Sequence, residues 1–141
     1  MKIGIVGLGY VGLVTGAVLA DQGHYIIGVD IDENKVNGLN YNKIPIYEPG
    51  LDELIMKNRE KIQFTTNYSA LSDANVVFIA VSTPTINGKI FLDYIYSAAK
   101  NLQKILNNES IVVTKSTVIP GTSRKVKEIT KREVIVNPEF L

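Results

Sequence analysis

A glycine-rich turn near the start of the sequence limits the possible folds more than any other feature. An apolar run over residues 3–6 precedes it, and a second apolar stretch, residues 13–20, follows it. A strand, the spacing Gly-x-Gly-x-x-Gly and a helix in this order are typical of a turn that binds the phosphates of a dinucleotide. Gly7 permits the tight turn, Gly9 leaves the backbone open to a pyrophosphate, and Gly12 lets the helix approach the sheet. The N–H groups and the dipole of the helix start would then face the phosphates.

An acidic residue ends the second predicted strand. Residues 25–29 are mostly apolar, and Asp30 follows them, eighteen positions after Gly12. A carboxylate at this place can accept hydrogen bonds from the hydroxyls of the adenosine ribose, and it would repel the extra phosphate of NADP. Together with the glycine turn, Asp30 therefore predicts NAD as the cofactor. The alternative is a purely structural glycine turn in which Asp30 caps the next helix.

Composition narrows the range of functions. The chain has 141 residues, enough for one domain with a sizeable core, and its formal net charge is +1, so nothing global favours nucleic acid or an anionic membrane as a partner. It contains no cysteine, which excludes disulfides, thiolate metal ligands and a cysteine nucleophile from this stretch, and we predict no metal site. The basic residues near the last predicted helix are expected to form a solvated face, with the last two near the negative end of the helix dipole; they are Arg124, Lys125, Lys127, Lys131 and Arg132.

The ends of the sequence bear on location and domain organisation. No apolar run reaches the length of a membrane span, and residues 1–3 lead directly into the first strand without room for a signal peptide. We therefore expect a cytoplasmic protein. The sequence stops at residues 139–141 without a polar tail, from which we expect residues 1–141 to be one dinucleotide-binding domain of a longer protein.

Predicted strands and helices alternate along the chain, a pattern typical of an α/β protein with a parallel sheet. The strands are predicted at residues 3–6, 25–29, 62–65, 75–81, 110–114 and 134–136. The helices are predicted at residues 10–21, 33–39, 51–58, 93–106 and 120–131, with Asp93 capping the fourth and a loop over residues 82–88. We predict a Rossmann-type doubly wound sheet of six parallel strands in the order 3-2-1-4-5-6.

Polar segments follow several of these strands. Ligands of such sheets bind at the carboxyl ends of the strands, beside the point between strands one and four where the order reverses. The glycine turn and residues 82–85, 115–117 and 137–139 should lie along that edge. Thr117 and Glu139 can therefore reach the place where a substrate would meet the cofactor. A carboxylate there can accept a proton, whereas a threonine is a poor base and is better suited to orienting a water.

These segments resemble the NAD-binding domain of the UDP-glucose and GDP-mannose dehydrogenase family. The matching segments are residues 2–12, 28–32, 45–51, 82–85, 115–118 and 137–141. The resemblance covers the whole chain, and its most specific parts are Tyr-Glu-Pro-Gly-Leu at residues 47–51 and Asn-Pro-Glu-Phe-Leu at residues 137–141. Within the family the motifs are most similar to UDP-glucose 6-dehydrogenases. The UDP-N-acetylmannosamine and GDP-mannose dehydrogenases are close alternatives.

The resemblance implies an activity and a set of site residues. The family oxidises the primary alcohol of a sugar nucleotide twice, to the carboxylate, with two NAD+. By resemblance, the cofactor contacts are Gly7, Gly9, Tyr10, Val11, Gly12, Asp30, Lys35, Thr83, Ser116 and Thr117. Asp30 and Lys35 would hold the adenosine ribose, and Thr83 and Ser116 would line the nicotinamide side. Thr117 would hold a water or the substrate oxygen. Glu139, Phe140 and Leu141 would contact the sugar nucleotide, with Glu139 a candidate general base in the hydrolytic step.

The resemblance also limits what these residues can do alone. In the family the second oxidation passes through a thioester on a cysteine, and residues 1–141 contain none. We therefore expect them to bind NAD without completing the reaction, and the complete protein to be a homodimer that acts on a nucleotide sugar, UDP-glucose first. Two alternatives stay open. One is an NAD-dependent dehydrogenase of a hydroxy acid or hydroxyacyl thioester, and the other is a non-catalytic NAD-binding module.

Overall fold

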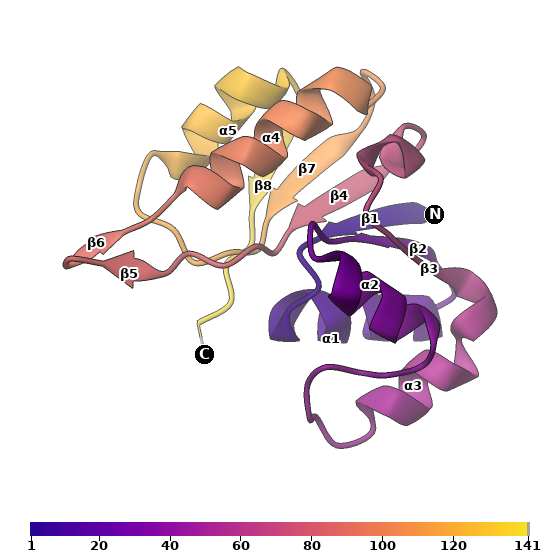
Figure 1. Ribbon diagram of the computed structural model, residues 1–141. Coiled ribbons are helices and arrows are strands. Elements are labelled where there is room, and N and C mark those ends of the chain that lie inside the picture. Colours follow the sequence, from indigo (N-terminus) through magenta and orange to yellow (C-terminus); the bar gives the residue numbers. More distant parts are fainter. Residues whose placement is uncertain (141) are drawn as a thin grey trace.

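Six parallel strands form the main sheet of the computed structural model, which describes residues 1–140 (Figure 1). They are β1 (Lys2–Val6), β2 (Tyr25–Val29), β3 (Ile62–Thr65), β4 (Val76–Ile79), β7 (Ile111–Thr114) and β8 (Glu133–Val136). Their order across the sheet is β3-β2-β1-β4-β7-β8, and each neighbouring pair is parallel. This is the order 3-2-1-4-5-6 of a Rossmann-type doubly wound sheet, so the predicted α/β fold is confirmed.

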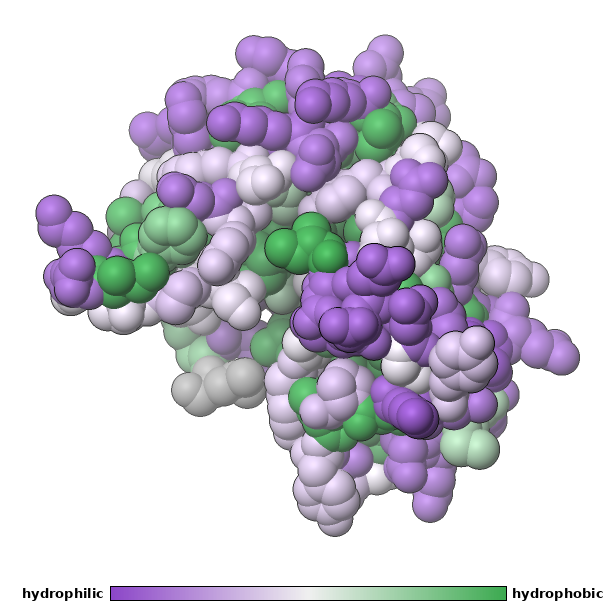
Figure 2. All heavy atoms as spheres, viewed as in Figure 1, coloured by the Kyte–Doolittle hydropathy of each residue, from purple (hydrophilic) through white to green (hydrophobic). Residues whose placement is uncertain are grey.

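Helices cover the sheet on both faces. They are α1 (Tyr10–Asp21), α2 (Glu33–Asn40), α3 (Leu51–Lys57), α4 (Asp93–Ile105) and α5 (Thr122–Thr130), with short 3₁₀ turns at η1 (Arg59–Lys61) and η2 (Tyr68–Leu71). The apolar sides of α1, α2 and α3 share one core with β1, β2 and β3. The apolar sides of α4 and α5 share a second core with β4 and β7. Polar side chains cover the outward surfaces of α4 and α5 at the top of Figure 2.

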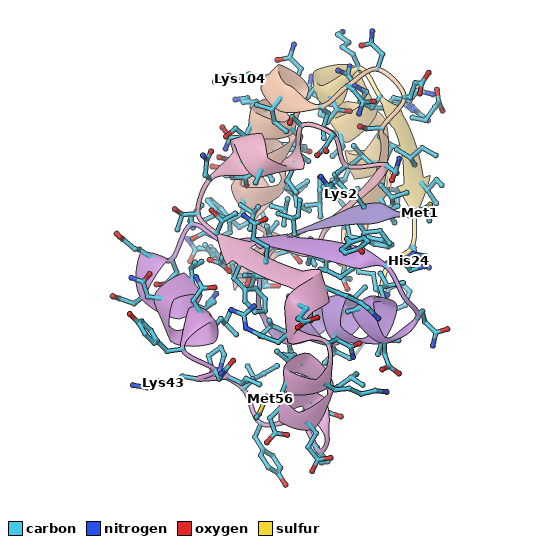
Figure 3. The ribbon with its side chains drawn as sticks, turned by 90° about the vertical axis from the view of Figure 1, so that its right-hand side faces the viewer. Met1, Lys2, His24, Lys43, Met56 and Lys104 are labelled. Carbon is cyan, nitrogen blue, oxygen red and sulfur yellow. The ribbon has the colours of Figure 1, made fainter. Side chains whose placement is uncertain are left out.

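The beginnings of the strands lie at the opposite edge from the glycine turn. The amino group of Met1 lies 3.3 Å from Nδ1 of His24, directly before β1 and β2 respectively. Figure 3 shows the two residues close together at this edge, with Lys2 beside them. His24 is therefore a turn residue far from the carboxyl ends of the strands.

A small hairpin replaces part of the predicted loop after β4. Strands β5 (Thr85–Ile86) and β6 (Lys89–Ile90) pair antiparallel, and Asn87 and Gly88 connect them. Both connecting residues have positive φ, 51° and 74°, as the tightest hairpin turns require, and Asn-Gly is the dipeptide that adopts this conformation most readily. The loop predicted over residues 82–88 is therefore wrong in part. In Figure 1 the hairpin extends sideways from the body of the molecule.

Two predictions about helix ends need correction. Asp93 does not cap α4: the N-cap is Leu92, and Asp93 is the first residue of the helix. Arg132 does not belong to a solvated face, because its half-buried guanidinium donates hydrogen bonds to four backbone carbonyls at the ends of α4 and α5. The other four basic residues of that set are exposed as predicted; they are Arg124, Lys125, Lys127 and Lys131.

Candidate functional site

The glycine turn combines two structurally required glycines with one that leaves open space. Gly7 has φ +96°, and a Cβ on it would lie 2.7 Å from the carbonyl oxygen of Ala80. A Cβ on Gly12 would lie 1.9 Å from the carbonyl oxygen of Gly7 and 3.2 Å from Ile5, so Gly12 is needed for the turn itself as well as for the approach to the sheet. A Cβ on Gly9 would meet nothing within 4 Å. The space in front of Gly9 is therefore free for a ligand.

The start of α1 is left without an acidic partner. Gly9 is the N-cap, it makes no side-chain hydrogen bond, and the first turn of the helix contains no acidic residue. The positive end of the helix dipole therefore lies beside the open space at Gly9, an arrangement that favours a phosphate. Tyr10 is 42% exposed and Val11 is half-buried, and both belong to this first turn.

Asp30 follows β2 and is held by three donors. Its Oδ2 accepts from the backbone N–H of Leu8 at 2.8 Å and from Nζ of Lys35 at 2.8 Å, and its Oδ1 accepts from the N–H of Asp32 at 2.9 Å. Burial raises the pKa of Asp30, but these hydrogen bonds outweigh burial and hold the pKa below its ordinary value. The carboxylate is therefore ionised and fixed between the glycine turn and α2.

The alternative role for Asp30 is wrong. The N-cap of α2 is Asp32, whose Oδ1 accepts from the N–H of Lys35 at 3.1 Å. Asp30 instead connects the second strand to the glycine turn. An ionised carboxylate offers about four acceptor positions, so one position on Oδ1 stays available to a hydroxyl group.

A cavity of about 340 Å³ opens beside these residues. Its lining includes Gly7, Gly9, Asp30 and Lys35 on one side. On the other side lie segments after β4 and in η2 and α4, and the residues there are Tyr68, Ala80, Val81, Ser82, Tyr94, Ser97 and Ala98. In Figure 2 apolar residues are visible between the polar surfaces of the upper helices and of α2. A cavity of this size, apolar with a few polar groups, suits the nucleoside part of a cofactor.

Three polar residues of this lining were missed from the sequence. Tyr68 lies in η2 and is half-buried, and burial raises the pKa of its phenol. Tyr94 and Ser97 lie one turn apart on α4. The available signal was their helical spacing together with Ala98 in the first helix after β4, the strand beside the point of reversal, but no motif assigns these residues.

A second group of predicted residues meets at the ends of β4, β7 and β8. The hydroxyl of Thr83 donates to the carbonyl oxygen of Thr117 at 2.8 Å, and the hydroxyl of Thr117 donates to the carbonyl oxygen of Glu139 at 2.9 Å. The hydroxyl of Ser116 donates to the carbonyl oxygen of Val81 at 2.6 Å. Nζ of Lys115 lies 2.8 Å from Oε2 of Glu139. These bonds join the three loops into one surface.

The two groups are adjacent but distinct. Thr83, Ser116, Thr117 and Glu139 do not line the cavity, whereas Val81 lines it and also accepts the hydrogen bond of Ser116. The loop after β4 therefore connects the cavity to the second group. Phe140 is 80% exposed, and Leu141 lies outside the described residues.

A comparison with protein families identifies the chain. A sequence model of the UDP-glucose/GDP-mannose dehydrogenase family, NAD binding domain, matches residues 1–141. The chain belongs to this family. Its cofactor is accordingly NAD, in agreement with the glycine turn, the open space at Gly9 and the ionised Asp30.

Related proteins support the same assignment. The UDP-glucose 6-dehydrogenase of Rhizobium meliloti is 43% identical over 153 residues, which cover 100% of this chain and 35% of that protein. A crystal structure of GDP-mannose dehydrogenase from Pseudomonas aeruginosa has a TM-score of 0.88 at 35% identity, covering 100% of this chain and 36% of that one. The structure of UDP-D-ManNAc dehydrogenase from Pyrococcus horikoshii has a TM-score of 0.92 at 28% identity and covers 100% and 37%. The chain thus spans about a third of the length of these relatives.

The described part of the chain lacks two kinds of feature. Residues 1–140 contain no helix long and apolar enough to cross a membrane. They also contain no group of three or more histidine, aspartate or glutamate side chains that could hold a metal ion.

Proposed function

We propose that this chain is the NAD-binding domain of a longer sugar-nucleotide 6-dehydrogenase that oxidises UDP-glucose to UDP-glucuronate with two NAD+. The observation that carries the proposal is the meeting of Thr117 and Glu139 at the strand edge that also holds the glycine turn. A dehydrogenase needs such a pair, a hydroxyl that orients oxygen and a carboxylate that accepts protons, beside its cofactor. Four relatives named UDP-glucose 6-dehydrogenase are 37–43% identical over 99–100% of the chain.

We assign the site residues to the adenosine, the pyrophosphate and the nicotinamide of NAD, one after another along the site. The adenosine would occupy the cavity, with its ribose hydroxyls at the free acceptor position of Asp30 and beside Lys35. The pyrophosphate would lie against Gly9, where the backbone is open and the N–H groups of Tyr10 and Val11 begin the helix. The nicotinamide would then lie toward Thr83, Ser116 and Thr117.

The chain's own residues handle oxygen and protons. When bound, NAD+ accepts a hydride from the alcohol carbon of the sugar in the first oxidation, and a second NAD+ accepts one in the second oxidation, which in the family passes through a thioester on a cysteine that residues 1–141 do not contain. Glu139 would accept the proton of the water that enters in the hydrolytic step, and the Thr117 hydroxyl, which already donates to the Glu139 carbonyl, would accept a hydrogen bond that orients that water. Overall, one alcohol, one water and two NAD+ give one carboxylate, two NADH and three protons.

A panel of substrates tests the proposed function directly. The complete protein is mixed with NAD+ and UDP-glucose, UDP-N-acetylmannosamine or GDP-mannose, and NADH is followed by its absorbance. We expect UDP-glucose to give the highest kcat/KM and two NADH per sugar. A preference for one of the other two sugars would correct the substrate and keep the reaction class. NAD binding without NADH formation from any of them would contradict the proposal and favour a non-catalytic NAD-binding module.

A substitution of Asp30 tests the cofactor site separately. Asp30→Ala removes a charged acceptor of hydrogen bonds and should weaken NAD binding by about 1–3 kcal/mol, measured by isothermal titration. The same change should reduce the preference for NAD over NADP, because the repulsive carboxylate is lost. Asp73→Ala is the matched control, since Asp73 also pairs with a lysine, Lys2, but at the other edge of the sheet. Equal NAD affinities of the two variants would contradict the assignment of Asp30.

A further inference from the structure

Lys115 contacts Glu139 through both its backbone and its side chain. The residue directly follows β7, and its carbonyl oxygen accepts a hydrogen bond from the N–H of Glu139 at 3.3 Å. Its Nζ lies 2.8 Å from Oε2 of Glu139. Thr117, two residues later, binds the Glu139 carbonyl from the same loop. The backbone and the carboxylate of Glu139 are therefore both fixed by the segment that follows β7.

The Lys115–Glu139 pair differs from the surface ion pairs of the chain. Within residues 1–140 the side chain of Lys115 is 14% exposed, the least of any ion-paired lysine. The pair Lys127–Glu133 has a similar length, 2.9 Å, but its side chains are 53% and 75% exposed. A lysine is seldom buried without a specific partner, because its ammonium group loses hydration and its long side chain loses freedom. Lys115 is thus held in place, whereas an exposed pair such as Lys127–Glu133 exchanges freely with water.

The ion pair leaves one oxygen of Glu139 for chemistry. Oε2 is engaged by Lys115, whereas Oε1 has no hydrogen bond or ion pair within residues 1–140. The side chain of Glu139 is 40% exposed, so a water or a substrate hydroxyl can reach it. A carboxylate that pivots freely would present either oxygen in many directions, and the ammonium group at 2.8 Å from Oε2 restricts that motion.

We propose that Lys115 is a positioning residue for the oxidation. It holds Oε2 of Glu139 and thereby directs Oε1 toward the oxygen that releases its proton beside Thr117. Lys115 itself exchanges no proton and touches neither cofactor nor substrate. This inference rests on the proposed function, because it gives Glu139 the role of proton acceptor.

Kinetics of three variants of the complete protein test the inference. Lys115→Met keeps the length of the side chain and removes its charge. We expect kcat to fall about 10²-fold, the loss that a misplacement of about 1 Å can cause, while the KM of the sugar nucleotide, the Kd of NAD and the thermal midpoint stay close to those of the unmodified protein. Lys115→Arg retains a cation and should recover most of kcat. Lys127→Met, the matched control, should leave kcat unchanged because exposed ion pairs contribute little.

A double-mutant cycle with Glu139 shows whether Lys115 acts through that residue. In the background of Glu139→Gln, which lacks the proton acceptor, Lys115→Met should lower kcat by less than about twofold, because coupled residues are not additive. Lys115→Gln is a milder replacement and serves in the same cycle if the Met variant does not fold.

Several outcomes would overturn the inference. One is a Lys115→Met variant whose kcat equals that of Lys127→Met. Another is a parallel loss of kcat, NAD affinity and thermal stability that arginine does not restore, which would mean a purely structural role. Additive effects of Lys115→Met and Glu139→Gln on kcat would also overturn the inference, because Lys115 would then act independently of Glu139. If none of the sugar nucleotides leads the unmodified protein to form NADH, the proposed function itself is contradicted, and the role of Lys115 with it.

Discussion

At the scale of single residues, the glycines of the turn separate folding from binding. Gly12→Ala places a Cβ 1.9 Å from the backbone oxygen of Gly7, so the turn must open and the free energy of unfolding should fall by about 2 kcal/mol or more. Gly9→Ala meets nothing within 4 Å, and Gly9 has φ −82°, which alanine adopts readily. Its Cβ instead occupies the space assigned to the pyrophosphate.

We therefore expect Gly9→Ala to fold with nearly unchanged stability and to lose most of its NAD affinity. Urea unfolding of the NAD-free protein gives the stability, and isothermal titration gives the affinity. Gly12→Ala should show the opposite, a larger change in the free energy of unfolding than in the free energy of NAD binding. If Gly9→Ala binds NAD as the unmodified protein does, the pyrophosphate does not lie at Gly9.

The ionised state of Asp30 makes folding sensitive to acid. Its pKa is lowered in the folded protein because hydrogen bonds from Lys35, Asp32 and Leu8 outweigh burial. A lowered folded-state pKa stabilises the fold above the unfolded-state value, about 3.9, and this stabilisation is lost as the pH falls through the folded-state pKa.

The unmodified protein should accordingly lose more stability than Asp30→Asn between pH 5 and 3, a range chosen to bracket the carboxyl pKa of about 3.9. Urea unfolding at a series of pH values measures the difference. Asp21 and Asp73 also have lowered pKa values through their lysine partners, but they are present in both proteins and cancel in the comparison. Parallel pH curves would mean that the carboxylate of Asp30 is not ionised against its three donors.

At the scale of elements, Arg132 joins the ends of two helices. Its Nε donates to the carbonyl oxygen of Asn107 at 2.6 Å, and its Nη2 donates to that of Leu106 at 2.5 Å, both just after α4. Its Nη1 donates to the carbonyl oxygens of Thr130 and Lys131 at 3.1 and 3.2 Å, where α5 ends. Carbonyls at a helix end lack partners within the helix, and a cation is favourable at that end.

Arg132→Ala should therefore destabilise the protein by about 2 kcal/mol or more, because hydrogen bonds to a charged group are the stronger ones. Arg132→Lys keeps the charge but lacks the planar fork of donors, and it should recover only part of the loss. Arg124→Ala, an exposed arginine of α5, is the control and should change little. Equal unfolding curves for Arg132→Ala and Arg124→Ala would show that the contact between the helix ends contributes nothing.

The elements that the sequence predicts well are those with an unambiguous apolar pattern. Residues 62–65 were predicted as the strand that β3 forms because buried and exposed residues alternate there, and residues 10–21 as the helix that α1 forms because the glycine turn precedes this apolar stretch. The hairpin of β5 and β6 was missed although Asn87-Gly88 is a strong turn signal, since its strands have two residues each and no buried face. The position of Arg132 at the negative end of the α5 dipole is as predicted, but its contacts with the carbonyls of residues 106 and 107 were missed because these are distant in sequence and carry no side-chain signal.

At the scale of the whole molecule, the cavity lies at the carboxyl ends of β1, β2 and β4, against the core that α4 and α5 share with the sheet. The glycine turn and the acid after the second strand predict Gly9 and Asp30, the family resemblance adds Lys35, and the structure brings all three to one cavity. Tyr68, Tyr94 and Ser97 come from the other side of the cavity and are set by how α4 and η2 pack, which no local pattern encodes. The contact of Lys115 with Glu139 likewise depends on the pairing of β7 with β8.

The cavity is lined by the glycine turn and the end of β2 on one side and by η2, the segment after β4 and α4 on the other. NAD should therefore stabilise these parts of the molecule together. A ligand that binds only the folded state at 100 times its Kd adds about 2.7 kcal/mol to the free energy of unfolding, visible as a rise in the thermal midpoint. Hydrogen exchange should slow both in residues 29–35, at the end of β2, and in residues 80–98, which run from β4 into α4. NADP at the same concentration should protect less, and Gly9→Ala should show little protection by either. Slower exchange confined to residues 29–35 would mean that Tyr68, Tyr94 and Ser97 do not contact the cofactor.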